Sequence, residues 1–266
     1  MLQSLLRDLK RCFTSLLFWL CIAACMASVV ISLTANLYLF PEAFRTAGAL
    51  TMFLHGTALS FGGSFELLAP LIATLPFSLA YIQDLSSGNI QYNITRQAPK
   101  RYFITRYIST ALSGGLVYIL SYSLLLALSL LLSRVPAYRI YLDPMTAFRY
   151  TYDRSLLAYT LLYTLHSFMF GCSYALLALG ISALFQNQLL ALIAPVSLYH
   201  SGVLLAWIFP KIIVYDIVKY IPYNTLSVMS KPSLQIWLDH ISVIFLATLL
   251  YVAGVIRYRK RSFVLQ

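Results

Sequence analysis

The sequence predicts an all-α, polytopic membrane protein with six transmembrane helices and both termini in the cytoplasm. Three observations support this fold class: the composition, the lengths of the apolar runs and the placement of the basic residues. The 266 residues are 60% hydrophobic and only 10% charged, whereas soluble domains are about 45–50% apolar and about 25% charged. A chain this apolar cannot cover a water-facing surface, so the composition excludes a soluble domain and excludes disorder.

The first twelve residues predict an amphipathic helix lying in the membrane interface. Leu2, Leu5, Leu6 and Leu9 recur at helical spacing, with basic residues on the opposite side. The apolar run that follows is too long for the core of a signal peptide, although a cleaved signal peptide is the competing interpretation. We expect six apolar segments, each long enough to span a bilayer. The predicted spans are residues 13–33, 64–83, 107–132, 155–185, 189–209 and 234–256.

The stretch 47–82 is the ambiguous part of this scheme. It is too long for one span and short for two spans with a turn. The pair Gly62-Gly63 favours a break before the second span, and Pro70 and Pro76 predict kinks within it. Residues 47–63 would then form a helix partly buried in the outer leaflet. Outside the membrane, residues 133–154 and 210–233 are rich in Tyr, which suits either an aromatic belt or a re-entrant helix.

The positions of the basic residues set the predicted orientation. The formal net charge is +11, which in a soluble protein would suggest a nucleic-acid partner. Eleven of the 19 Lys and Arg residues instead lie in 1–12, 84–106 and 257–266, on the same side of an even number of spans. Lys and Arg concentrate on the cytoplasmic side of membrane proteins. The charge therefore records orientation, and we expect no nucleic-acid partner.

Signatures of catalysis and metal binding are missing from the sequence. It contains no His-Glu-x-x-His, no Gly-x-Ser-x-Gly and no phosphate-binding loop. Its four cysteines lack metal-ligand spacing. The segment Leu112–Gly115 matches the start of a cassette signature loop, but it lies in an apolar span, where the small residues of 111–115 favour close helix packing. We therefore predict neither an enzyme nor a metal site.

Polar residues inside the predicted spans are candidates for a substrate pathway. Ionisable residues within a membrane are functional candidates by default. The polar residues near Pro76 and Pro195 could line a pathway or satisfy backbone groups freed by the prolines. His166 and His200 could face one another across helices, or simply hydrogen-bond neighbouring helices. The candidate pathway residues are Glu66, Thr74, Ser78, Ser197, Tyr199 and His200.

The predicted cytoplasmic loop 84–106 gives the strongest indication of function in the sequence. Ser86 or Ser87 can cap a short helix, and Pro99 can open the next one. The loop therefore has defined helix start and stop signals and a mixture of apolar and polar residues. These features favour an element that docks on a partner over a loop that only connects two spans. We expect residues 86–97 to contact a partner protein.

This loop resembles the permeases of the type-two ATP-binding-cassette transporter family, and most closely those of bacterial peptide-export and bacteriocin-immunity systems. The matching residues are Asp84-x3-Gly88 and Arg96-x3-Lys100-Arg101-Tyr102, with Asp84 where many members carry Glu. The resemblance extends to span number, topology and the N-terminal helix. It implies a coupling helix that docks on a separate cassette ATPase. The implied contact residues are Asp84, Ser87, Gly88, Asn89, Arg96, Gln97, Lys100 and Arg101.

The resemblance further implies a subunit of the bacterial cytoplasmic membrane that pairs with a second permease, either a copy or a paralogue. ATP and Mg²⁺ would be bound by the ATPase, with no cofactor in this chain. A hydrophobic or amphipathic peptide or lipid would be exported or extracted. Two alternatives remain: a membrane-embedded enzyme acting on lipid or peptide through His166, His200 or Asp239, and a non-transporting sensor or immunity module.

Overall fold

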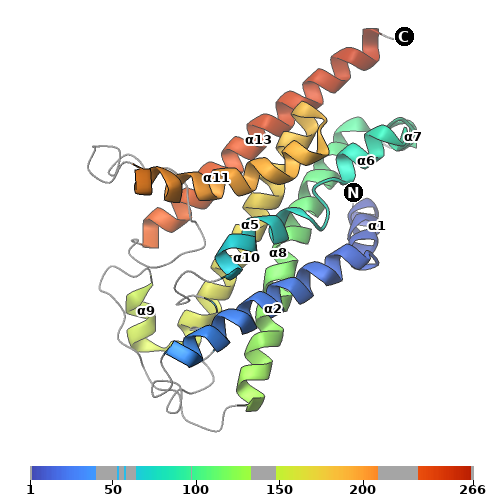
Figure 1. Ribbon diagram of the computed structural model, residues 1–266. Helices are drawn as coiled ribbons and strands as arrows, with labels where there is room; N and C mark the ends of the chain where they lie inside the picture. The colour runs from blue at the N-terminus through green and yellow to red at the C-terminus, as the bar shows by residue number, and fades with distance from the viewer. Residues whose placement is uncertain are drawn as a thin grey trace.

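The protein is all-helical in the part of the chain that the computed structural model describes, namely residues 2–39, 53, 57, 64–96, 98–132, 148–208 and 233–264. Figure 1 shows long helices crossing at several angles, with shorter ones at both ends of the bundle. This confirms the predicted all-α class. The helices are α1 (Leu2–Phe13), α2 (Leu16–Leu39), α5 (Ser64–Thr74), α6 (Ala80–Ser86), α7 (Asn89–Arg96), α8 (Pro99–Leu132), α9 (Arg149–Arg154), α10 (Leu156–Phe185), α11 (Gln188–Ile208) and α13 (Ser233–Val264).

Helix α10 is the centre of the fold. Its residues are apolar on every side, as expected of a helix that is buried all round, and it packs against α5, α8, α11 and α13. Ser155 caps its start by accepting a hydrogen bond from the Ala158 amide at 3.3 Å. Its end is set by Gln186, which lies in the left-handed region at φ 55°. The observed helix therefore coincides with the predicted span 155–185.

Small residues let α10 approach its neighbours closely. A Cβ added to Gly114 of α8 would lie 2.5 Å from both the Gly171 carbonyl oxygen and the Ala175 Cβ of α10. On the other side of α10, a Cβ on Gly180 would lie 2.6 Å from the Ala247 carbonyl oxygen of α13. The small residues of 111–115 thus serve helix packing, as predicted.

The chain bends sharply between α1 and α2. The two helices meet at 62°, and the Trp19 indole N–H donates to the Phe13 carbonyl at 2.8 Å across the corner. Helix α1 confirms the amphipathic helix expected over residues 1–12. It packs against α8, while Leu2 and Leu6 remain exposed.

Three described helices are long and apolar enough to cross a membrane: α8, α10 and α13, or four crossings if α1 and α2 form one bent span. Helices α8 and α13 contain the predicted spans 107–132 and 234–256, while α2 covers residues 16–33 of the span 13–33 and α10 covers residues 156–185 of the span 155–185. Helix α11 covers most of 189–209 and contains Pro195. The count of six spans remains a prediction.

The predicted span 64–83 is broken rather than only kinked, because α5 ends at Thr74 and a turn over residues 75–79 separates it from α6. Pro70 lies inside α5, and Pro76, which lacks an amide hydrogen, lies in the turn. The segments 47–63, 133–147 and 209–232, where a re-entrant helix and external loops were expected, lie outside the described residues apart from Phe53 and Thr57.

The basic segments gather at one end of the bundle. Helix α1 packs on the first part of α8 through contacts of Asp8 with Arg106 and Ser109. The last part of α13 packs on the same region, where the Tyr251 hydroxyl donates to the Phe103 carbonyl at 2.9 Å. The start of α1 and the last part of α13 therefore lie at the same end of the bundle as the start of α8, and α13 extends beyond it (Figure 1). We call this the basic end. At the opposite end, the Phe148 amide before α9 donates to Ser233 Oγ at 2.9 Å.

Candidate functional site at the basic end

Helix α7 forms the outer part of the cytoplasmic loop predicted from the sequence. Gly88 separates it from α6 and has φ +71°, a left-handed conformation that glycine adopts without steric cost. The Ser87 hydroxyl donates to the Gln83 carbonyl at 2.7 Å, so it closes the end of α6. This differs from the expectation that a serine caps the start of the next helix, because the hydroxyl reaches back to the free carbonyls of α6. Pro99 opens α8 as predicted.

Helix α7 has an anchored face and an exposed face. Ile90 is only 1% exposed and belongs to an apolar cluster with Tyr81 and Tyr102, against which Ile94 also packs. The exposed face displays Asn89, Gln91, Tyr92 and Thr95. Tyr92 is 53% exposed. Sequence reasoning missed it, although its position two residues after Ile90 in an amphipathic helix gave the signal.

The other predicted contact residues divide into two groups. Ser87, Gly88, Lys100 and Arg101 are exposed around α7, where a partner could reach them. Arg96 is the last residue of α7. Its side chain lies outside the described part of the structure, and so does all of Gln97.

Asp84 lies beneath this surface rather than on it. It is 1% exposed, and its carboxylate accepts hydrogen bonds from Arg11 at 3.0 Å, from Tyr102 at 2.9 Å and from Arg106. The carboxylate thereby joins α1, α6 and the first two turns of α8. A direct contact of Asp84 with a partner does not fit this burial, so its role at the site is to hold α7 and its neighbours together.

The cluster around Asp84 contains a second carboxylate, that of Asp8. Its Oδ2 lies 3.5 Å from Arg106 Nη1 and accepts a hydrogen bond from Ser109 at 3.3 Å. Burial raises the pKa of Asp8 above its ordinary value, while Arg106 and Ser109 act to lower it. The Arg106 guanidinium also lies 5.0 Å from the centre of the Phe77 ring. Two carboxylates and two guanidinium groups therefore balance one another, with Asp84 and Arg106 buried and the Arg11 side chain 48% exposed.

The structure does not bring the six candidate pathway residues onto one surface. Thr74 and Ser78 are fully buried. The Thr74 hydroxyl donates to the Leu71 carbonyl at 2.9 Å and that of Ser78 to the Thr74 carbonyl, so both hydroxyls bond to nearby backbone rather than to a pathway. Tyr199 is buried against Phe170 and Tyr174, whereas Ser197 is exposed.

The remaining two pathway candidates are His200 and Glu66. His200 is half-buried on α11, with its ring 4.9 Å from that of Tyr199. Glu66 lies in the first turn of α5, and its side chain is outside the described part of the structure.

The buried His166 of α10 hydrogen-bonds a neighbouring helix, which is the second of the two arrangements considered for it. Its Nδ1 lies 2.9 Å from Nε2 of His240 of α13. Ser173 Oγ lies 3.4 Å from His240 Nδ1. Gln235 donates to the buried Asp239 carboxylate at 2.9 Å. The contacts of His240 with His166 and Ser173 tie α10 to α13, whereas that of Gln235 with Asp239 lies within α13. Among the described residues no three His, Cys, Asp or Glu side chains lie close enough to hold a metal ion.

Comparison with known proteins assigns no family. The chain matches no protein-family model, no curated protein and no solved structure.

Proposed function

We propose that this protein is the permease subunit of an ATP-binding-cassette exporter in a bacterial cytoplasmic membrane. A separate cassette ATPase would bind ATP and Mg²⁺, and the permease, paired with a second copy or a paralogue, would export or extract an amphipathic peptide or lipid. The observation that carries the proposal is α7, a short helix at the basic end that exposes a polar face and is anchored by Ile90.

The anchoring supports a coupling role for α7. A partner can change the conformation of the permease only through contacts that differ between its states. Force applied to α7 would pass through Ile90 into the apolar cluster with Tyr81 and Tyr102. Through Gly88 and α6 it would also reach Asp84, which is bonded to α1 and α8. An exposed spacer loop would have no such connections.

The test is co-purification with the ATPase encoded beside this chain, comparing two matched substitutions. Tyr92→Glu changes the exposed face of α7. Tyr150→Glu makes the same change in α9, where Tyr150 is 68% exposed at the opposite end of the bundle. We expect Tyr92→Glu to lower ATPase recovery at least tenfold and to abolish stimulation of ATP hydrolysis, because it places a desolvated charge in the contact. Tyr150→Glu should change neither.

Equal recovery with both variants would contradict the docking assignment. Recovery of no ATPase with the unsubstituted chain would contradict the proposed class. If substrate stimulates ATP hydrolysis but does not move into or out of vesicles, the chain is a sensor or immunity module that uses the same docking helix.

A further inference from the structure

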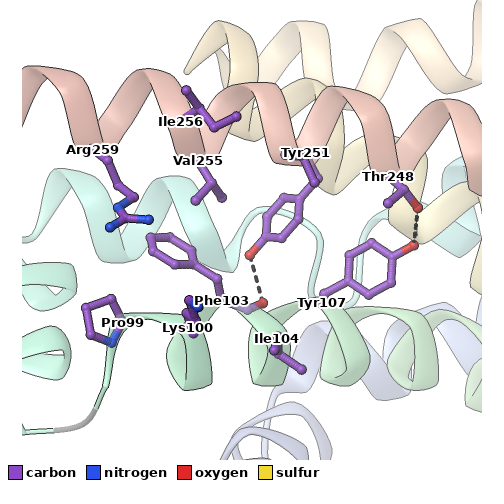
Figure 2. Close-up of a pocket in the computed structure, with 11 residues that line it drawn as sticks. Pro99, Lys100, Phe103, Ile104, Tyr107, Thr248, Tyr251, Val255, Ile256 and Arg259 are labelled. Atoms are coloured by element: carbon purple, nitrogen blue, oxygen red, sulfur yellow. Dashed lines mark hydrogen bonds between the residues drawn. The ribbon is translucent and has the colours of Figure 1, made fainter.

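A groove runs between the start of α8 and the last part of α13. It has a volume of about 500 Å³, within the size range of pockets that bind small molecules. Figure 2 shows the two helices facing each other with the groove-lining side chains between them. The lining residues are Pro99, Lys100, Phe103, Ile104, Tyr107, Thr248, Tyr251, Val252, Val255, Ile256 and Arg259.

One end of this groove is cationic. Lys100 and Arg259 are both exposed there, one on each helix. In Figure 2 the Arg259 guanidinium points from α13 toward the first turn of α8, where Lys100 lies. No lining residue in the described part of the chain is acidic. An anion between the two helices would therefore be attracted by a positive charge from each helix.

The rest of the groove is apolar, including its floor. Its two tyrosine hydroxyls are engaged within the protein: that of Tyr251 donates to the Phe103 carbonyl at 2.9 Å, and that of Tyr107 lies 2.6 Å from Thr248 Oγ1. The dashed lines in Figure 2 mark both contacts. With these hydroxyls occupied, the tyrosines present mainly their rings to the groove.

The groove opens outward from the bundle. Ile104, Val252 and Ile256 line it and are each about half exposed, at 49%, 48% and 49%. The segment from Lys100 to Tyr107 extends about 11 Å along α8 at 1.5 Å per residue. A chain entering from the hydrocarbon region could lie along these side chains while its charged head stays at the cationic end.

We propose that this groove binds one anionic phospholipid of the surrounding bilayer. The headgroup phosphate would sit between Lys100 and Arg259, and an acyl chain would lie along Ile104, Val252 and Ile256. Basic pockets between transmembrane helices on the cytoplasmic side are suited to anionic headgroups. The inference does not depend on a partner ATPase, so it can hold or fail separately from the proposed function.

The chemistry of the groove distinguishes this ligand from related ones. A neutral phospholipid has no net negative charge, so the two cations would attract it less strongly than an anionic one. A free phosphate ester would use the cationic end but leave the apolar walls exposed. A phospholipid with a net negative charge satisfies both ends of the groove at once.

The test is native mass spectrometry of the full-length chain in detergent, titrated with palmitoyl-oleoyl phosphatidylglycerol or phosphatidylcholine. The double variant Lys100→Gln/Arg259→Gln removes the cationic end. The control Arg101→Gln/Lys260→Gln removes the same charge from exposed positions on the same two helices that do not line the groove. A third variant, Ile104→Trp, fills the apolar part at an exposed position.

We expect one phosphatidylglycerol to bind in preference to phosphatidylcholine. A cation near an anionic lipid surface contributes roughly fivefold in affinity, so the first double variant should lose about 30-fold. The control should lose less than about threefold. Ile104→Trp should also weaken binding, and glycerol phosphate should not compete.

Four results would overturn the proposal. These are equal binding of the two lipids, equal losses in the two double variants, competition by glycerol phosphate as strong as by the lipid, and a lipid-free chain whose groove is covered by a second copy in a stable dimer.

Discussion

At the scale of single residues, the basic end depends on one carboxylate more than on the other. Asp84 accepts three hydrogen bonds and is almost inaccessible. Asp8 has weaker contacts at 3.3 and 3.5 Å, and its side chain is 17% exposed. A buried guanidinium that loses its carboxylate remains as an unpaired charge, which is strongly destabilising. In this protein the buried guanidinium is that of Arg106, which pairs with Asp84.

Asp84→Asn should lower the free energy of unfolding by about 3–5 kcal/mol, because it removes the charge that balances Arg106. Unfolding in detergent, followed by tyrosine and tryptophan fluorescence, measures the change. Asp153→Asn at the other end is the control. Its carboxylate lies 3.5 Å from Arg149 and is 58% exposed, so its loss should cost less than about 1 kcal/mol. Similar losses for both variants would contradict the role given to Asp84.

Asp8→Asn should behave differently, and its effect should depend on pH. Because burial raises the pKa of Asp8 in the folded protein, the folded state holds this proton more tightly than the unfolded chain does. The resulting stabilisation is present at low pH and is lost as the pH rises through the folded-state pKa. Asparagine does not titrate. The midpoint temperature of Asp8→Asn relative to the unsubstituted protein should therefore increase from pH 4 to pH 7, and a decrease would contradict this.

At the scale of helices, the closest packing is that of α8 on α10. Gly114→Ala would place a methyl group 2.5 Å from the Gly171 carbonyl oxygen, and backbone atoms cannot move aside as a flexible side chain can. We expect a loss of about 1–3 kcal/mol, measured by thermal unfolding in detergent. Ala127→Val on the exposed face of α8 adds more bulk and should have little effect. A larger effect at Ala127 than at Gly114 would contradict this account of the helix contact.

The sequence identified these elements unevenly. Helix α10 was predicted almost to the residue, because Ser155 and the end of its apolar run mark both limits. The sequence predicted kinks at Pro70 and Pro76 but not a break in the helix. In the structure Pro70 lies inside α5, whereas the chain leaves the helix over residues 75–79, around Pro76. Proline alone does not determine whether a helix bends or ends, since that depends on which neighbours satisfy the freed carbonyls.

The candidate site was likewise predicted only in part. Local signals located α7, Gly88 and Pro99. The partners of Asp84 were not predictable, because Arg11 and Arg106 are 73 and 22 residues away and nothing in the local sequence specifies a contact over such a separation. The pairing of His166 with His240 was not predictable for the same reason, because it depends on how α10 and α13 cross.

At the scale of the whole molecule, the ends of the bundle differ in charge, and this predicts orientation. Lys260→Cys at the basic end and Asp153→Cys in α9 place thiols at opposite ends, while the four native cysteines are buried. We expect a membrane-impermeant maleimide to label Asp153→Cys in intact cells and Lys260→Cys only after permeabilisation. The reverse pattern would invert the topology. Labelling of both in intact cells would place the two ends on one side.

The bond between Arg11 and Asp84 also has a consequence for the order of events during synthesis. Helix α1 is translated before its partners Asp84, Arg106 and Ser109, which follow 73 or more residues later. Arg11 and Asp8 therefore cannot form these contacts until the start of α8 has been synthesised. The final position of α1 is thus set only after α5, α6 and α7 have been made, later than its place in the sequence suggests.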